Sequence, residues 1–285
     1  MNKQKIKSIA KKSGILSLYS KYRRWYDNTH CDRFECGIGD ILLLRDVPSN
    51  NQLLLTSRLM DVEDYLSGKD KTFPWQNTIS RKAYGDKHRE EDGNRSFKAL
   101  IESYLKDGYH PDSIITCDND MNLMDGNHRM GLHIHEGIER VNVRRVHRKV
   151  PFQYGGDWYF ENGLSATFMD CIYERYDAVQ KWLIESGNTF CVYAEGSDAE
   201  VKEVESVLKH LCTVLCIKSV AGGVILQFSM PSPEYSFKDN KLVSKRAEQI
   251  ESILRKRFTS VQLKLEVAKN CLEGKVCFEK YQKQY

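Results

Sequence analysis

One short segment combines side chains that suit the binding of a phosphate group. It reads Asp125-Gly126-Asn127-His128-Arg129 and stands where a helix is predicted to begin. Gly126 permits a sharp turn, and a helix N-terminus offers N–H groups that have no partner inside the helix. His128 and Arg129 add donors, and a guanidinium matches phosphate oxygens well. The Asp125 carboxylate could accept a proton or hold a magnesium ion.

The elements that must position this segment follow from hydrophobic periodicity and turn residues. In chain order they are a helix Ser96–Lys106 with Ser96 as N-cap and Gly108 as its end, a buried strand Ser113–Cys117, a turn Asp118–Met121, a short strand Asn122–Met124, a helix running to about Glu136, and a strand Val141–Val146. A structural alternative stays open at this point. In it, Asp125 is only a helix N-cap and His128 lies at the edge of the core.

Residues 96–146 resemble the core of the ParB/sulfiredoxin superfamily, and residues 50–147 resemble it more loosely. The resemblance is carried by the helix that Ser96 begins and Gly108 ends, by the signature Asp125–Arg129, and by the closing strand. It implies that Gly126, Asn127, His128 and Arg129 bind the phosphates of a nucleotide.

Departures from the superfamily pattern separate its branches. Sulfiredoxins carry a nucleophilic cysteine where this chain has Asn127, which disfavours sulfinic acid reduction. The chain also shows no recognition helix of the kind that follows in chromosome-partitioning ParB proteins. Its signature is most similar to that of ADP-dependent free serine kinases. This resemblance implies a kinase that uses ATP or ADP with Mg²⁺ and phosphorylates a hydroxyl of a small metabolite, such as an amino acid or sugar derivative.

The same resemblance implies a carboxylate that acts as base on the acceptor hydroxyl. By order along the chain that base is Glu63, after a strand Gln52–Ser57, and together with Asp125 it completes the expected catalytic pair. Asp61 and Asp64 are competing candidates. A solvated first turn of a helix over residues 61–67 is the structural alternative for all three acids.

Three further side chains are weaker candidates for substrate contact. They are Arg58, Trp75 and Arg81; the last two fall in the polar stretch 67–95, which is predicted to form an extended loop. The basic run from Arg144 to Lys149 could add charge to the site or protect an edge strand. His133 and His135 point about 200° apart on a helix, which disfavours a shared zinc ion. The metal ligands are left unassigned.

The positive charge of the chain is concentrated at its N-terminus. Residues 1–26 hold eight Lys and Arg and no acid, so a net charge of +4 for the whole chain leaves −4 for the rest. This disfavours a partner such as nucleic acid that would need a basic surface throughout. Residues 3–26 are predicted to form a basic amphipathic helix. It could lie on an anionic membrane or pack on the protein's own core with its lysines in solvent.

Composition and cysteine usage indicate an ordinary globular protein. The sequence is 41% hydrophobic and 29% charged, and it has no apolar run long enough for a membrane span or a signal peptide. Nine cysteines without regular spacing favour reduced thiols over a disulfide framework or a zinc site. We therefore expect a cytoplasmic protein, peripheral at the inner face of the membrane if the N-terminal helix binds there.

The predicted fold class is α+β, with a ParB/sulfiredoxin-like nucleotide-binding domain followed by a ferredoxin-like domain. The predicted divisions are the basic helix 1–30, the first domain 31–152, a linker and long helix 153–188, and the second domain 189–285. The second domain rests on the order β-α-β-β-α-β. Its predicted elements are Phe190–Tyr193, Asp198–His210, Thr213–Ser219, Gly223–Phe228, Leu242–Phe258 and Val261–Val267, after a long helix Leu164–Glu185. Two further strands, Ile41–Leu44 and Gln52–Leu55, are predicted near the N-terminus.

Two functions of other classes remain open beside the kinase. One is a ParB-like module that senses a nucleotide or associates with DNA without phosphorylating a metabolite. The other is a nuclease of the same superfamily.

Overall fold

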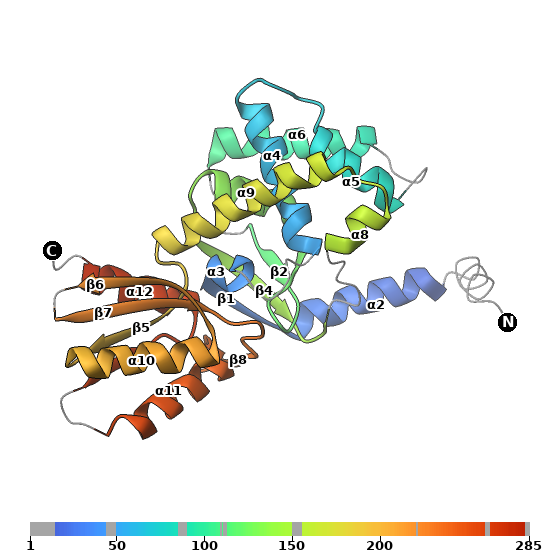
Figure 1. Cartoon of the computed structure of the whole chain (residues 1–285). Coiled ribbons are helices and arrows are strands. Elements are labelled where there is room, and N and C mark those ends of the chain that lie inside the picture. The colour runs from blue at the N-terminus through green and yellow to red at the C-terminus, as the bar shows by residue number, and fades with distance from the viewer. Residues whose placement is uncertain are drawn as a thin grey trace.

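The fold combines helices and small sheets, which confirms the predicted α+β class. The computed structural model describes residues 15–43, 50–84, 90–108, 110, 113–149, 156–220, 222–259 and 263–282. Among these residues the strands form two four-stranded sheets and one two-stranded hairpin (Figure 1). None of the described helices has the length and apolar character that a membrane crossing would need.

The first sheet carries the segment Asp125–Arg129 at its edge. Its strands are β1 (Cys31–Gly37), β2 (Ile115–Cys117), β3 (Leu123–Asp125) and β4 (Arg140–Val146), in the order β1-β4-β2-β3. β2 runs parallel to β4, while the β1–β4 and β2–β3 pairs are antiparallel. The strands predicted at 113–117, 122–124 and 141–146 are present with shifted ends. β1 was not predicted.

Helices gather on one side of the first sheet, as Figure 1 shows for α4, α5, α6 and α9. The helices of this half are α2 (Ile15–Thr29), α3 (Gly39–Leu42), α4 (Asn50–Leu66), α5 (Pro74–Tyr84), α6 (Glu90–Asp107), α7 (Asn127–His135), α8 (Gly156–Glu161) and α9 (Ala166–Glu185). α4 packs closely on α7 at Gly131. A Cβ added to this glycine would lie only 3.2 Å from the Leu59 nitrogen.

The two strands predicted near the N-terminus are wrong. Ile41 and Leu42 lie in α3, and the apolar run at 52–55 belongs to α4. The buried residues Leu55, Leu59 and Val62 recur at helical spacing along α4. A short apolar run fits a strand or one turn of a buried helix equally well, so only the longer pattern separates them.

The extended loop predicted over residues 67–95 is also wrong. α5 occupies residues 74–84 and α6 begins at Glu90, so Ser96 lies inside a helix and is not its N-cap. Pro74 is the first residue of α5, a position that proline favours. This local signal was available in the sequence. Few of the residues in this stretch are apolar, because each helix buries only a narrow face.

The second sheet is fully antiparallel and covered on both faces. β5 (Phe190–Glu195), β6 (Thr213–Val220), β7 (Gly223–Ser229) and β10 (Lys264–Val267) take the order β10-β5-β7-β6. Alternate β5 residues enter different clusters: Val192 joins the core that includes α10 (Asp198–Leu211) and α11 (Lys245–Arg257), while Tyr193 joins α12 (Cys271–Gln282). α12 was not predicted.

The helix predicted over 242–258 begins later than expected. A hairpin of β8 (Tyr235–Lys238) and β9 (Lys241–Ser244) precedes it, and Ser244 caps α11 by accepting a hydrogen bond from the Ala247 N–H at 3.1 Å. The strand predicted at 261–267 is present as β10, although residues 261 and 262 lie outside the described part of the chain.

The two sheets share one hydrophobic cluster. It contains Ile115 and Val143 of the first sheet together with Phe190 and Leu226 of the second. Polar contacts also cross between the two halves. The Asn188 side chain accepts from the Gly39 N–H at 2.8 Å and donates to the Glu139 carbonyl at 2.9 Å.

Candidate phosphate-binding site

The predicted strand–turn–helix around Asp125 is present, with Gly126 at the turn. β3 ends at Asp125, and Gly126 adopts φ +100° before α7 begins at Asn127. The Asp125 carboxylate accepts the Gly126 N–H at 2.8 Å and does not cap the helix. The alternative that made Asp125 an N-cap is therefore wrong. Among the described residues, no acceptor lies within hydrogen-bond distance of the first backbone N–H groups of α7.

Arg129 lies over this uncapped helix end. Its Nη1 donates to the Ile114 carbonyl at 2.7 Å, and its Nη2 lies 3.8 Å from Asp125 Oδ2. A Cβ added to Gly126 would lie 3.5 Å from Arg129 Nη2. A fixed cation and a helix N-terminus therefore meet at one turn of the backbone, an arrangement that favours an anion.

His128 is held in the neutral form. Its Nε2 lies 2.7 Å from Gln76 Oε1, and its ring packs 4.3 Å from the Phe97 ring. Burial, and after it the charges of Arg58 and Arg129, lower the pKa of His128 to about 3. At neutral pH this imidazole can donate a hydrogen bond but carries no positive charge toward a phosphate.

Asn127, the remaining residue of the signature, begins α7. Its Oδ1 atom is buried and has no hydrogen-bond partner among the residues described. This oxygen is an acceptor, so it cannot itself bind the oxygens of a phosphate, which need donors.

The three acids considered as base candidates all make contacts within the protein. Asp61 is buried and accepts the N–H groups of Trp75 and Gln76 at 3.0 and 2.8 Å. Glu63 faces α9 and holds the guanidinium of Arg175 with both oxygens, at 3.0 and 3.1 Å from Nε.

Asp64 makes two contacts of its own. It binds Lys69 Nζ at 2.9 Å and accepts from the indole N–H of Trp75, also at 2.9 Å. Residues 61 and 63 point to different sides of α4. The structure therefore does not bring Glu63 toward the face on which Asp61 meets α5.

Asp61 is unusual among these acids because its carboxylate is buried. Burial raises the pKa of Asp61 to about 7, against the opposing effect of its two backbone hydrogen bonds. The carboxylate caps the first turn of α5 and so fixes Gln76, which sequence reasoning missed. Gln76 in turn holds His128.

The weaker substrate candidates are placed differently from one another. Arg58 lies on α4, where its Nη1 donates to the Leu54 carbonyl at 2.9 Å, and its charge acts on both His128 and Asp61. Trp75 packs 5.1 Å from Phe168. Arg81 is exposed in the last turn of α5. The structure thus brings Arg58, His128 and Arg129 together.

The basic run that follows the site is engaged in structural contacts. Arg145 is buried and binds Asp32 at 2.8 Å. Arg148 pairs with Asp27 at 3.0 Å, and Lys149 pairs with Asp120 at 3.0 Å. These pairs leave little of the charge of this run for the site. The edge-strand alternative is nevertheless wrong, because β4 lies between β1 and β2 in the sheet.

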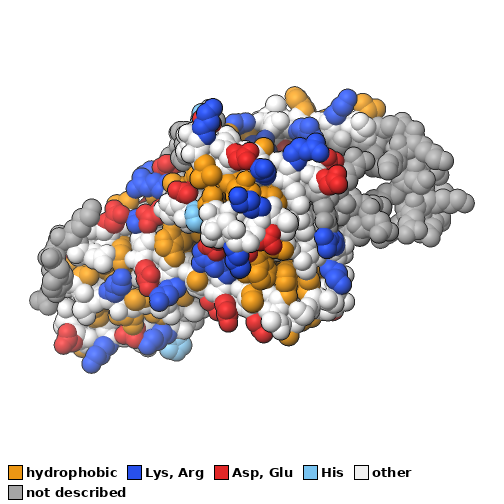
Figure 2. All heavy atoms as spheres, turned by 90° about the horizontal axis from the view of Figure 1, so that it is seen from above, with side chains coloured by type: hydrophobic (Ala, Val, Ile, Leu, Met, Phe, Trp, Pro, Cys, Tyr) orange, Lys and Arg blue, Asp and Glu red, His pale blue; other side chains and the backbone are white. Residues whose placement is uncertain are grey.

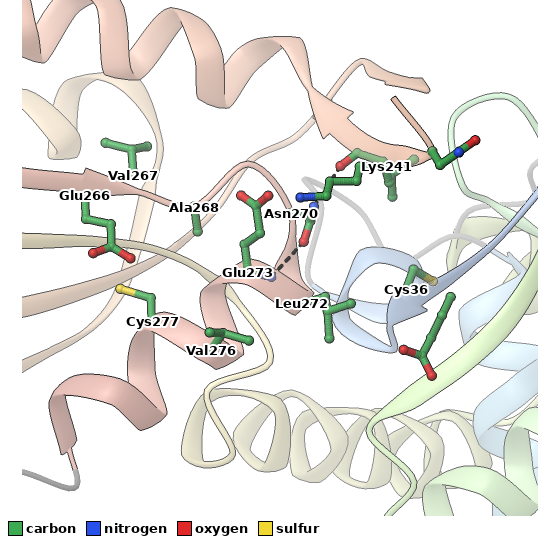
Figure 3. A pocket seen from close by; sticks show the side chains of 13 residues that line it. Cys36, Lys241, Glu266, Val267, Ala268, Asn270, Leu272, Glu273, Val276 and Cys277 are labelled. Atoms are coloured by element: carbon green, nitrogen blue, oxygen red, sulfur yellow. Dashed lines mark hydrogen bonds between the residues drawn. The ribbon is translucent and has the colours of Figure 1, made fainter. Parts of the chain in front are cut away.

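A cavity of about 370 Å³ lies between β1, β9, β10 and α12 (Figure 3). Its charged lining residues are Glu35, Glu266, Glu273 and Lys241. Three carboxylates against one ammonium repel a phosphate, so this cavity does not suit the phosphates of a nucleotide. Within the described residues, no group of three or more His, Cys, Asp or Glu side chains could hold a metal ion.

Searches among protein families, curated proteins and solved structures found no match to this chain.

Proposed function

We propose that the chain binds a nucleotide at the start of α7 and transfers its terminal phosphoryl group to a small metabolite. The acceptor is a hydroxyl of an amino acid or sugar derivative, and the donor is ATP or ADP with Mg²⁺. The observation that carries the proposal is the uncapped N-terminus of α7, entered through Gly126 at φ +100° and overlaid by Arg129.

The phosphates would be held chiefly by the backbone. N–H groups at a helix start and the positive end of the helix dipole stabilise an anion without mobile side chains. Arg129 adds a charged donor next to them, and the neutral ring of His128 positions the loop through Gln76. Phosphoryl transfer needs mainly such positioning and charge stabilisation.

The base in this proposal is Asp125. Its side chain is 73% exposed, and its contacts are the Gly126 N–H and, at 3.8 Å, Arg129. Glu63 is not used, because both of its oxygens bind Arg175. In the transfer, the acceptor oxygen bonds to the terminal phosphorus while the bond from that phosphorus to its bridging oxygen breaks. The nucleotide leaves with the electron pair, and the hydroxyl proton passes to Asp125.

The segment Asp125–Arg129 offers Mg²⁺ one protein ligand, the carboxylate of Asp125. Mg²⁺ commonly binds one or two protein carboxylates together with substrate phosphates, and the exposed Asp125 supplies one. When bound, the ion neutralises charge on the phosphates. Asp125 therefore has two candidate roles, base and metal ligand, which the experiment below separates.

The proposed architecture is a ParB/sulfiredoxin-like domain followed by a ferredoxin-like domain. The sheet order β10-β5-β7-β6, the antiparallel pairing, and a helix after β5 and another before β10 support the second part. This fold hosts many functions and by itself indicates no chemistry.

A second candidate is a nucleotide-binding module that transfers no phosphoryl group. It is favoured by the engagement of Asp61, Glu63 and Asp64 in contacts within the protein. Binding to DNA receives less support, since Lys/Arg and Asp/Glu side chains are interspersed on the face seen in Figure 2. A nuclease is supported by no observation beyond the resemblance.

The first experiment is a thermal-shift panel of ATP, ADP, CTP and GTP with Mg²⁺. A ligand that binds only the native state raises its stability, by about 2.7 kcal/mol at a hundredfold excess over Kd. We expect at least one nucleotide to raise the Tm of the wild type and to lose this effect in Arg129→Ala. Arg95→Ala, which removes an exposed cation of α6, is the matched control. If no nucleotide raises the Tm of the wild type, the proposal is wrong.

The second experiment separates the kinase from the binding module. The protein is incubated with a metabolite pool and with ATP or ADP labelled at the terminal phosphate. Asp125→Asn should abolish transfer; retained nucleotide binding identifies a base, and loss of the Mg²⁺-dependent part of binding identifies a metal ligand. Nucleotide binding by the wild type without any transfer would favour the second candidate.

A further inference from the structure

The helix α2 presents an apolar face to solvent. The five large side chains on this face are between 42% and 68% exposed; they are Leu18, Tyr19, Tyr22, Trp25 and Tyr26. At 100° per residue they fall within an arc of about 120° on the helix. In Figure 1, α2 extends away from the rest of the molecule. A contiguous exposed patch of this kind marks an interaction surface.

Cations flank this face. Lys21 and Arg23 lie about 100° to either side of Tyr22 by helical geometry, and Arg24 follows on the opposite side of the helix. Within the described residues, no carboxylate lies within ion-pair distance of these three side chains. An aromatic face bordered by cations complements a surface that is negatively charged outside and apolar beneath.

A groove of about 410 Å³ lies beside this face, between α2 and the residues that follow β4. Its lining residues are Tyr19, Tyr22, Arg23, Tyr26, Asp27, His147, Arg148 and Lys149. Arg148 is neutralised by Asp27 and Lys149 by Asp120, each at 3.0 Å. Arg23 therefore contributes a positive charge that no carboxylate of the described residues neutralises, and the tyrosines contribute apolar walls. A lipid phosphate could bind the charge while its glycerol backbone contacts the walls.

The C-terminal end of α2 is fixed to the first sheet. Arg148 binds both oxygens of Asp27, Arg144 binds the side chain of Asn28, and the Tyr26 ring stacks on His30 at 4.3 Å. The aromatic face is therefore held in a defined orientation relative to the body of the protein.

We propose that α2 and the adjoining groove dock on an anionic phospholipid membrane, with the helix lying in the plane of the interface. Tyr and Trp concentrate at membrane interfaces, and Lys and Arg beside them bind anionic headgroups. Single-stranded nucleic acid is the competing occupant, because bases stack on exposed rings. Here, however, Tyr22 packs against Trp25 at 5.8 Å and Tyr26 at 6.2 Å, and His30 covers Tyr26. The His30 ring thus occupies one face of Tyr26, where a base would otherwise stack. This inference is independent of the proposed nucleotide chemistry.

The test is flotation of the full chain with vesicles of phosphatidylcholine alone and of phosphatidylcholine mixed with phosphatidylglycerol. The wild type should float with the mixed vesicles only. Tyr22→Ser with Trp25→Ser should remove this binding. Lys21→Ala with Arg23→Ala should weaken it roughly 25-fold, since each surface cation contributes about fivefold.

Matched controls carry the same changes on other helices. Leu105→Ser with Val276→Ser removes equally exposed apolar side chains, and Arg95→Ala with Lys106→Ala removes two exposed cations of α6. Both pairs should bind like the wild type. Circular dichroism checks that every variant is folded.

Three results would overturn the proposal. The first is undiminished flotation of both α2 variants, and the second is equal binding of the wild type to neutral and anionic vesicles. The third is absence of binding to either kind of vesicle. In that case the α2 face has another occupant, either a second copy of the chain, in a dimer that the Tyr22/Trp25 variant abolishes, or single-stranded RNA.

Discussion

The imidazole of His128 and the amide of Gln76 lie 2.7 Å apart, between Nε2 and Oε1, and join the start of α7 to α5. The backbone N–H of Gln76 is in turn held by the buried carboxylate of Asp61 at 2.8 Å. A chain of hydrogen bonds thus runs from α4 through α5 to the loop proposed to bind phosphate. The conformation of that loop depends on residues about fifty positions earlier in the sequence.

Gln76→Leu should destabilise the protein by about 1–3 kcal/mol, since it leaves the half-buried donor of His128 without its acceptor. The measurement is the midpoint of urea unfolding. Gln282→Leu, an exposed change in α12, is the control and should leave the midpoint within experimental error. Equal midpoints for the two variants would show that this hydrogen bond is not maintained in solution.

The neutral His128 predicts a loss of stability in acid. Its pKa is about 3 in the folded state, well below its ordinary value of 6.5, because of burial and the nearby charges of Arg58 and Arg129. Between these values the unfolded state binds a proton that the folded state does not. The contribution of His128 to stability therefore decreases as pH falls from about 6.5 to about 3. In His128→Asn the unfolding free energy should depend less on pH over this range. Parallel profiles of wild type and variant would contradict the prediction.

Asp61 predicts a dependence of the opposite sign. Burial raises its pKa from 3.8 to about 7 in the folded state. Between these values the folded state binds the extra proton, so its contribution to stability decreases as pH rises from about 4 to about 7. Relative to Asp61→Asn, the wild type should lose on the order of a few kcal/mol across this range. Urea unfolding at a series of pH values measures the unfolding free energy of both proteins. If the unfolding free energy of the wild type rises with pH relative to that of Asp61→Asn, the assigned protonation is excluded.

Gly126→Ala should be destabilising for two separate reasons. The residue adopts φ +100°, and its new Cβ would lie 2.8 Å from Ile115 Cδ1. Gly137→Ala is the matched control, because it has φ +66° but no atom within 4 Å of the Cβ. Backbone strain alone costs about 1–2 kcal/mol, and the clash adds about 1–3 kcal/mol. Thermal unfolding should therefore rank Gly126→Ala below Gly137→Ala, and the reverse ranking would contradict the described turn.

Glu63→Gln should leave nucleotide binding and phosphoryl transfer unchanged. The Glu63–Arg175 pair is partly exposed, so its loss should cost no more than about 1 kcal/mol of stability. The measurements are Tm and the transfer assay, with Asp125→Asn compared in parallel. Loss of transfer in Glu63→Gln at unchanged nucleotide binding would restore Glu63 as the base.

Local sequence determined the elements around Asp125 and most of those after residue 164. A strand, a glycine turn and a helix were predictable at Ser113–Glu136, since turn residues and periodicity act within a few positions. The same holds for β5, α10, β6 and β7. Charge arithmetic likewise located the basic N-terminus. Amphipathic spacing predicted a helix over residues 3–26; its described part, from Ile15, lies in α2, which continues to Thr29, and residues 3–14 lie outside the described part of the chain.

Tertiary structure decided the rest, because those features depend on partners distant in the chain. The run at 52–55 is part of a helix, α4, that packs on α7. Within the polar stretch 67–95, α5 begins where the Asp61 side chain caps its first turn. β1 is a strand because it pairs with β4, more than a hundred residues later. The roles open to Glu63 and His128 were likewise decided by Arg175 and Gln76. Local sequence spacing does not indicate such pairs, because their residues are far apart in the chain and come into contact only in the folded structure.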